Sequence, residues 1–200
     1  MITAESLMSI DKDQLPEAAK ALDRSELPWL IDILKDDKIR YQAFLLLQCR
    51  SKLFDDVYPF WETFRSKLKN ENSYQRSIGL MLIAENAGWD SENRMDDTID
   101  EYLELLKDEK PITVRQCIQS LGKIVKCKPN LCDKIGSSLI SLDMETIKET
   151  MRKSVLLDIL NVLADIRVTN KTDEIESFIL GALSGEILDK KSKKQLAAIL

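Results

Sequence analysis

The fold is decided by the stretch LKDEKPITVR at residues 106–115, because the chain repeats it. LKDDKIR at residues 34–40 is nearly the same sequence, and LKNEN at residues 68–72, followed by Gln75 and Arg76, is a third version. Each copy lies between two stretches whose apolar residues have helical spacing. It contains the end of the first stretch, a polar turn and the start of the second stretch. The chain therefore reads as a series of helical hairpins.

The arginines of the repeat confirm its period and align its second helices. Arg40, Arg76, Arg115 and Arg152 follow one another at intervals of 36, 39 and 37 residues. Three residues after each arginine stands a small or apolar residue, namely Ala43, Gly79, Ile118 and Val155. Positions spaced in this way share one face of a helix, which predicts a core stripe. Gln75 interrupts the apolar position before the arginine, and Tyr74 is expected to fill its place.

The hairpins divide the chain as follows. Residues 1–25 are predicted to form an N-terminal helical cap, since the end units of a repeat array are usually atypical. The predicted repeats are residues 26–53, 54–88, 91–127, 129–168 and 172–200, about five hairpins in one continuous domain. The longest helix is expected at residues 145–166.

The composition excludes most catalytic chemistry. The chain of 200 residues contains no histidine, which is the commonest metal ligand and the usual general base near neutral pH. We therefore predict that the protein is not an enzyme and has no catalytic residues, no cofactor and no metal site. The four cysteines, Cys49, Cys117, Cys127 and Cys132, lack the spacing of a zinc site and are predicted to be buried free thiols in a reducing compartment.

The N-terminus and the apolar segments predict a cytoplasmic protein. Residues 1–6 lack the basic start and apolar run of a signal peptide. The most apolar segment, residues 155–166, is interrupted by Asp158, Asn161 and Asp165. A membrane is therefore not expected among the partners.

The repeat resembles the HEAT repeat of the HEAT and armadillo class. The likeness is carried mainly by VRQCIQSLG at residues 114–122 and IRYQA at residues 39–43, and it covers roughly residues 26–200. It implies an all-α fold, a right-handed α-α superhelix or HEAT-like solenoid, and a non-catalytic scaffold or adaptor that binds another protein along its concave row of second helices. It also implies a stabilising ladder between turn aspartates and helix arginines, here Asp36, Asp108, Arg40, Arg76, Arg115 and Arg152.

A narrower resemblance is to the DNA alkylation repair glycosylases, which are built of HEAT-like repeats. The run RQCIQSLGKI at residues 115–124 is similar to their penultimate repeats. This resemblance implies the alternative function, a nucleic-acid-binding protein. Those enzymes need a basic cleft lined by tryptophans and an aspartate, whereas here no tryptophan lies beyond Trp89. Their activity is therefore not carried over, and nucleic acid is disfavoured as a partner.

The candidate partner-binding residues lie on the second helices, on the side facing away from the core stripe. These residues are Tyr41, Gln48, Met81, Gln116 and Lys123. Trp89 joins them from the loop that follows residue 88, where it either anchors a partner or covers the end of its own hairpin. An ordinary solvated face would have a similar composition.

Charge is unevenly distributed along the chain. The net charge of −5 is accounted for by residues 90–110, where nine acids face three bases. This segment either receives a basic peptide or solvates one side of a helix. Residues 190–194 contain four lysines, and the apolar end at residues 196–200 has no polar cap. A further hypothesis is that the protein forms a homo-oligomer through its C-terminal repeat. Another is that it serves as a regulatory subunit.

Overall fold

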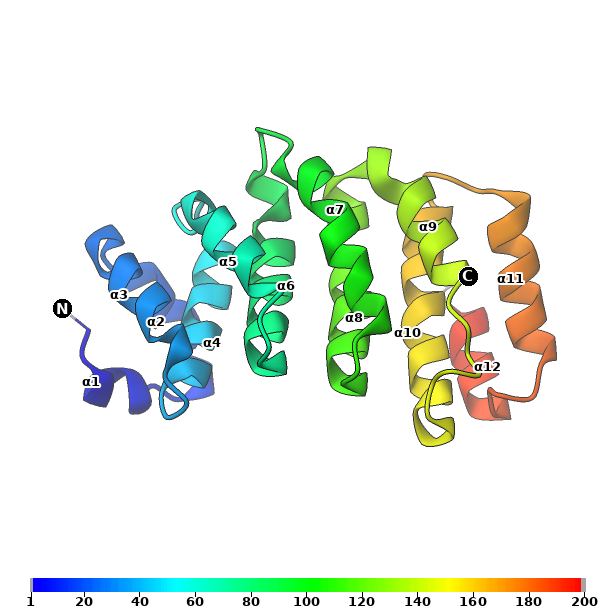
Figure 1. The fold of residues 1–200 in the computed structure, drawn as a ribbon, viewed down its shortest axis with the longest axis horizontal. Helices are drawn as coiled ribbons and strands as arrows, with labels where there is room; N and C mark the ends of the chain where they lie inside the picture. The colour runs from blue at the N-terminus through cyan, green and yellow to red at the C-terminus, as the bar shows by residue number, and fades with distance from the viewer. Residues whose placement is uncertain (1, 199–200) are drawn as a thin grey trace. The chain divides into compact units, whose positions relative to one another are not determined.

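The computed structural model describes residues 2–198, which fold as helices joined by turns (Figure 1). This confirms the predicted all-α class, whereas the right-handed superhelix stays a prediction. The chain divides into two compact units, unit 1 up to Arg94 and unit 2 from Met95 onward. The expectation of one continuous domain likewise stays a prediction. None of the described helices has the length and apolar character needed to cross a bilayer.

Unit 1 consists of short helices, several of which begin or end as 3-10 turns. Its α-helices are α1 (Ala4–Met8), α2 (Leu15–Ala21), α3 (Leu27–Asp32), α4 (Arg40–Ser51), α5 (Trp61–Lys67) and α6 (Ser73–Asn86). Its 3-10 helices are η1 (Lys12–Gln14), η2 (Arg24–Glu26), η3 (Ile33–Lys35), η4 (Tyr58–Phe60) and η5 (Ala87–Trp89). The helix pairs α3–α4 and α5–α6 fall within the predicted repeats 26–53 and 54–88.

Unit 2 contains the longer helices and the three remaining helix pairs. Its α-helices are α7 (Arg94–Glu104), α8 (Pro111–Cys127), α9 (Cys132–Ile140), α10 (Glu149–Arg167), α11 (Asp173–Ser184) and α12 (Lys190–Ala197). Its 3-10 helices are η6 (Leu105–Lys107) and η7 (Pro129–Leu131). The second helices α8 and α10 lie side by side (Figure 1). Of the helices in the described chain, α10 is the longest, as predicted, but it begins at Glu149 because residues 145–148 belong to the preceding turn.

In unit 1, the helices α5 and α6 approach each other closely at Gly79. A Cβ atom at Gly79 would lie 2.6 Å from the backbone oxygen of Phe64 and 2.9 Å from the Cβ of Lys67. The absence of a side chain at Gly79 therefore lets the two backbones approach. The largest buried side chains of α5, Trp61 and Phe64, have no exposed surface and fill the core beside this contact.

Gln75 occupies its buried position as a polar link between repeats. Its Nε2 donates to the carbonyl oxygen of Leu34 at 2.7 Å, and its Oε1 accepts from the Nζ of Lys67 at 2.6 Å. Because both ends of the amide are satisfied, burial of this polar side chain is not costly. The expectation that Tyr74 takes over the core position is wrong. Tyr74 is 64% exposed, and the guanidinium of Arg40 lies 4.5 Å from its ring centroid.

A buried ion pair joins α4 to the turn that follows it. The side chains of Arg50 and Asp56 are both almost fully enclosed, and Nη2 of Arg50 donates to Oδ2 of Asp56 at 2.6 Å. Nη1 of Arg50 donates to the carbonyl oxygen of Ala19 at 2.7 Å. The guanidinium also lies 3.8 Å from the ring centroid of Phe54. One arginine thus connects the N-terminal cap, α4 and the approach to α5.

A second buried polar contact fixes the start of η4. The hydroxyl of Tyr58 donates to Oδ1 of Asp90 at 2.8 Å, and the same oxygen accepts from the backbone nitrogen of Arg94 at 2.9 Å. Burial, together with the hydrogen bond to Asp90, raises the pKa of the Tyr58 phenol to about 12. The folded protein therefore holds this proton more tightly than the unfolded chain does.

The Tyr58 contact is expected to lose its stabilising effect in strong base. Because the folded pKa lies above the ordinary value of about 10, the stabilisation is complete below pH 10 and is lost as the pH rises towards 12. Two pKa units correspond to about 2.7 kcal/mol. Urea unfolding of the native protein and of Tyr58→Phe should show the difference in free energy of unfolding fall by about 2–3 kcal/mol over this range. A difference that does not change with pH would contradict the assignment.

The repeat arginines do not form a uniform ladder with the turn aspartates. Arg40 forms an ion pair with Asp37 in its own turn. Nη1 of Arg76 donates to the carbonyl oxygens of residues 70 and 71, both at 2.8 Å. Arg152 donates in the same way to the carbonyl oxygens of residues 145 and 147, both at 3.0 Å. These arginines therefore stabilise the turn that precedes their own helix.

Arg115 has a carboxylate partner on a neighbouring helix pair. Nε of Arg115 on α8 donates to Oδ2 of Asp158 on α10 at 2.6 Å. The partner is a residue of the second helix and not an aspartate of a turn. The turn aspartates Asp36 and Asp108 each accept from a backbone amide two residues ahead, at 2.9 and 2.8 Å. The ladder implied by the HEAT resemblance is thus corrected at Arg40, Arg152 and Asp36.

Candidate functional site

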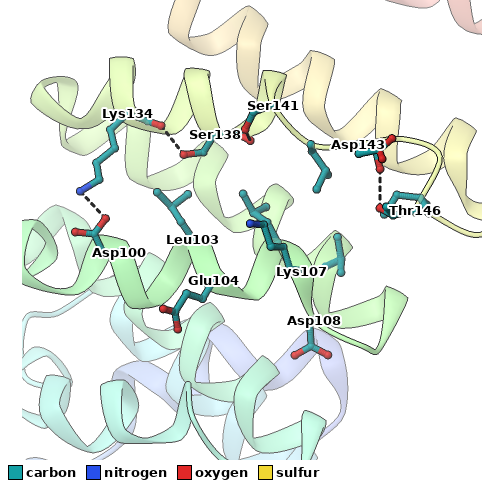
Figure 2. A pocket seen from close by; sticks show the side chains of 14 residues that line it. Asp100, Leu103, Glu104, Lys107, Asp108, Lys134, Ser138, Ser141, Asp143 and Thr146 are labelled. Carbon is teal, nitrogen blue, oxygen red and sulfur yellow. Dashed lines mark hydrogen bonds and ion pairs between the residues drawn. The ribbon is translucent and has the colours of Figure 1, made fainter.

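Unit 2 has a groove between its first helices α7 and α9. Its volume is about 890 Å³. Figure 2 shows the two helices running side by side, with the loop that leads into α10 at one end. The lining residues are Asp100, Leu103, Glu104, Leu106, Lys107, Asp108, Val114, Lys134, Ser138, Ser141, Leu142, Asp143, Thr146 and Ile147.

The floor of the groove is apolar. Leu106 and Val114 are buried at its base and are held by the packing of η6 against α8. Leu103, Leu142 and Ile147 are only half-buried and add apolar surface to the walls. A ligand that covers these three side chains would gain by removing apolar area from water, at about 25 cal/mol per Å².

The rim of the groove is acidic. Asp100, Glu104 and Asp108 line it from the α7 side, and Asp143 lines it from the loop. Two lysines also line the groove. Nζ of Lys134 reaches across from α9 to Oδ1 of Asp100 at 2.6 Å and closes one end (Figure 2). Four carboxylates against two ammonium groups give the lining an excess of negative charge.

The loop at the other end is held in place by hydrogen bonds. Oδ1 of Asp143 accepts from the backbone nitrogen of Glu145 at 2.8 Å, and Oγ1 of Thr146 donates to the carbonyl oxygen of Asp143 at 2.7 Å. Arg152 fixes the same loop from the first turn of α10. The walls at this end are therefore held by hydrogen bonds within the chain itself.

The predicted partner-binding residues do not line this groove, and they are divided between the two units. Tyr41, Gln48, Met81 and Trp89 belong to unit 1, and Gln116 and Lys123 belong to unit 2. Tyr41 is 59% exposed and Lys123 is exposed, whereas Gln48, Met81 and Gln116 are half-buried. The oxygen Oε1 of Gln116 is enclosed without a hydrogen-bond partner in the described structure.

Trp89 covers the end of its hairpin and also remains accessible. Its indole Nε1 donates to the carbonyl oxygen of Ser51 at 2.6 Å, which ties η5 to the end of α4. The side chain is nevertheless 39% exposed. The contact with Ser51 supports the structural interpretation of Trp89, and its role as a partner anchor stays a prediction.

Lys123 belongs to a smaller hollow between α8 and α10. This hollow has a volume of about 210 Å³ and is lined by Gln119, Gly122, Lys123, Lys126, Asp158, Asn161, Val162 and Asp165. Lys126 forms an ion pair with Asp165 at 3.1 Å, and Gln119 donates to Asp158 at 3.0 Å. Its cations and carboxylates are thus largely engaged with one another.

The described cysteines differ in their burial, and they form no metal-binding cluster with the carboxylates. Among residues 2–198, no group of three or more histidine, cysteine, aspartate or glutamate side chains converges as a metal site would require. Cys117 and Cys132 are buried, and burial raises the pKa of both thiols. Cys127 is exposed, so the prediction that all four thiols are buried is wrong there, and Cys49 is intermediate.

The groove is therefore the candidate functional site. It combines an apolar floor, a charged rim and a loop that is already ordered by hydrogen bonds. Comparisons with protein-family models, with curated proteins and with solved structures find no match to this chain.

Proposed function

We propose that the protein is a non-catalytic adaptor that binds another protein, and that the groove between α7 and α9 receives a segment of that partner. The partner segment carries basic side chains next to apolar ones. The observation that carries this proposal is the joining of half-buried apolar side chains and excess carboxylates in one groove of about 890 Å³. A space of this size accommodates several side chains of a peptide.

The apolar part of the groove supplies the binding energy in this proposal. Leu103, Leu142 and Ile147 stand partly exposed around a floor that is already packed. Partner side chains such as leucine or isoleucine would bury this surface and expel its water. Because the walls belong to helices and to a hydrogen-bonded loop, little ordering entropy is lost on binding.

The charged part of the groove determines whether a basic or an acidic partner segment binds. Glu104 and Asp143 line the groove, and no cation contacts either carboxylate in the described structure. A basic segment would be attracted to them, and an acidic segment would be repelled. The acidic run at residues 90–110 thereby takes the first of its two interpretations, as a receiver of a basic peptide.

The resemblance to HEAT repeats supports a binding role, but it implies a different binding surface from the groove. The resemblance implies binding along the second helices, whereas the groove lies between the first helices α7 and α9. On the second-helix side of unit 2, Arg115 is paired with Asp158 and Lys126 is paired with Asp165, and only the second of these cations lines the smaller hollow. Paired cations are poorly suited to the backbone of a nucleic acid, whose binding requires phosphate neutralisation by lysine and arginine.

A peptide array provides the test. The array would present short segments in which leucine or isoleucine alternates with arginine or lysine at varied spacings, with aspartate and glutamate versions beside them. We expect the labelled full chain to bind basic members and not their acidic counterparts. The affinity of the best members, measured by fluorescence anisotropy, should fall at higher salt because the carboxylates on the rim are open to solvent.

Matched variants connect the binding to the groove. Glu104→Lys combined with Asp143→Lys should reduce the affinity at least about tenfold, as expected for like charges placed against a basic segment. Glu17→Lys combined with Glu186→Lys changes the net charge equally at exposed sites outside the groove and should have a much smaller effect. Equal binding of basic and acidic peptides, or equal effects of the two variants, would rule out the proposal. Tighter binding of a single-stranded oligonucleotide than of any peptide would replace it with the nucleic-acid function.

A further inference from the structure

The two walls of the groove are helices whose backbones are already paired. The helix α7 and its continuation η6 form one wall and α9 forms the other, and Figure 2 shows them side by side. Inside an α-helix, each amide donates to the carbonyl oxygen four residues before it. Near the end of α9, the carbonyl oxygens of Ser137 and Leu139 accept from the backbone amides of Ser141 and Leu142, at 3.0 and 3.3 Å. The described walls therefore lack the row of free backbone groups that a sheet edge has.

The side chains of the lining do not replace such a row. An extended segment needs partners for both its amides and its carbonyl groups, because unpaired backbone groups are costly once water is excluded. Asparagine and glutamine side chains can donate and accept at the same time, but neither residue type is among the described lining residues. The hydroxyls of Ser138 and Ser141 donate to carbonyl oxygens of their own helix, at 2.8 and 2.9 Å. An extended segment would therefore leave backbone groups unpaired in the dry part of the groove.

The length of the groove also suits a helix. Lys134 is paired with Asp100 and closes one end, and the loop lies at the other end (Figure 2). Lys134 and Ser141 are seven residues apart along the α9 wall, which is about 10 Å along a helix axis. Over about 10 Å, a partner helix brings three side chains, at i, i+4 and i+7, to one face. An extended segment has about three residues in this length, and alternate ones point away from the groove.

The apolar and acidic side chains of the groove alternate along the chain. Leu103 of α7 is followed directly by Glu104, and Leu142 of the loop is followed directly by Asp143, and all four line the groove. Ile147 adds a third half-buried apolar side chain. An apolar stripe with basic side chains next to it matches this arrangement, and such a stripe is the surface of an amphipathic helix that binds in a groove.

We infer that the partner segment binds in the groove as a basic amphipathic α-helix. A helix pairs its own backbone groups, so it needs no backbone partners from the walls. Its apolar stripe covers Leu103, Leu142 and Ile147, and lysine or arginine beside the stripe lies near Glu104 and Asp143. This inference deepens the proposed function and rests on the groove as its binding site.

Two peptides of identical composition test the inference on the full chain. The helical version has leucine at i, i+4 and i+7 with arginines beside this stripe, and the alternating version has the same leucines at i, i+2 and i+4. In fluorescence anisotropy, the helical version should bind at least about tenfold more tightly, because it gathers its leucines on one face of a helix. The Cα chemical shifts of the isotope-labelled helical version should move to helical values when it binds.

Proline substitutions in the helical peptide provide a matched control. Proline in the middle should weaken binding about a hundredfold, because it removes a helical hydrogen bond and clashes with the preceding turn. Proline at the first helical position should keep the affinity, because the amide at that position has no partner within a helix.

Protein variants connect this preference to the groove. Ile147→Ala removes apolar surface from the groove and should reduce the preference for the helical version several-fold. Ile187→Ala changes an exposed isoleucine that does not line the groove, and it should keep the preference. If basic peptides bind but the two versions bind equally, or if a central proline has no effect, the helical inference is wrong and the proposed function stands. Equal effects of the two isoleucine variants also contradict the inference. If no basic peptide binds in either version, both are wrong.

Discussion

Replacing Asp56 with alanine is expected to lower the free energy of unfolding by about 3–5 kcal/mol, because the change leaves the guanidinium of Arg50 buried without its counterion. In the native protein, Arg50 donates three hydrogen bonds to the Asp56 carboxylate, at 2.6–3.2 Å, and both side chains are more than nine-tenths buried. The remaining bonds to the carbonyl oxygens of Ala19 and Lys20 cannot balance the charge. Urea unfolding followed by circular dichroism measures the loss.

An exposed ion pair is the control for this prediction. Glu17 and Lys20 are separated by a similar distance, 2.7 Å, but both are mostly exposed. Glu17→Ala should change the free energy of unfolding by less than about 1 kcal/mol. Replacing both buried partners, as Arg50→Met with Asp56→Leu, should cost less than Asp56→Ala alone, since no unpaired charge remains. A loss below about 1 kcal/mol in Asp56→Ala would show that water reaches the guanidinium.

Gly79→Ala is expected to destabilise the protein by about 1–3 kcal/mol, although alanine is the better helix former. The added methyl group would lie 2.6 Å from the carbonyl oxygen of Phe64, well inside contact distance. Because that oxygen belongs to the backbone of α5, a side-chain rotation cannot relieve the overlap. The helices α5 and α6 must separate, and the buried contacts around Trp61 and Phe64 loosen. The same unfolding measurement applies.

Two other glycines separate the steric effect from helix propensity. A Cβ at Gly181, inside α11, meets no atom within 4 Å, so Gly181→Ala should stabilise the protein by up to about 1 kcal/mol. A Cβ at Gly136 meets only side chains at 3.7–4.0 Å, which is ordinary contact, and Gly136→Ala should be close to neutral. If Gly79→Ala is as stable as Gly181→Ala, the approach of α5 and α6 is looser than described.

The helix pairs could be predicted from the sequence, but the partners of its polar residues could not. Periodicity and the recurring turn identify where hairpins begin, because a core stripe needs the same spacing wherever it occurs. The apolar pattern does not show why Gln75 is buried, since its amide is satisfied by Leu34 and Lys67. Arg152 likewise uses carbonyl groups of its own turn, and carbonyl groups have no signature in a sequence.

The candidate groove was only partly visible in the sequence. The acidic run at residues 90–110 allows two interpretations, a surface for a basic peptide or a solvated face of a helix, and three of its carboxylates, Asp100, Glu104 and Asp108, line the groove. The opposite wall comes from α9 and from the loop with Asp143 and Thr146, which lie some 40 residues further along. The loop could have been predicted from the long stretch of sequence between the apolar residues of α9 and Arg152. The partner-binding residues were predicted on the second helices because HEAT-like proteins generally bind partners there. That general rule does not predict where two neighbouring first helices leave a groove between them.

The tryptophans have a practical consequence for any study of this chain. All three, Trp29, Trp61 and Trp89, belong to unit 1, so unit 2 has no indole of its own. Indole emission therefore follows the melting of one unit, whereas helical ellipticity follows both. Superimposing the two signals in a single experiment shows whether the halves of the chain unfold as one cooperative system or as two.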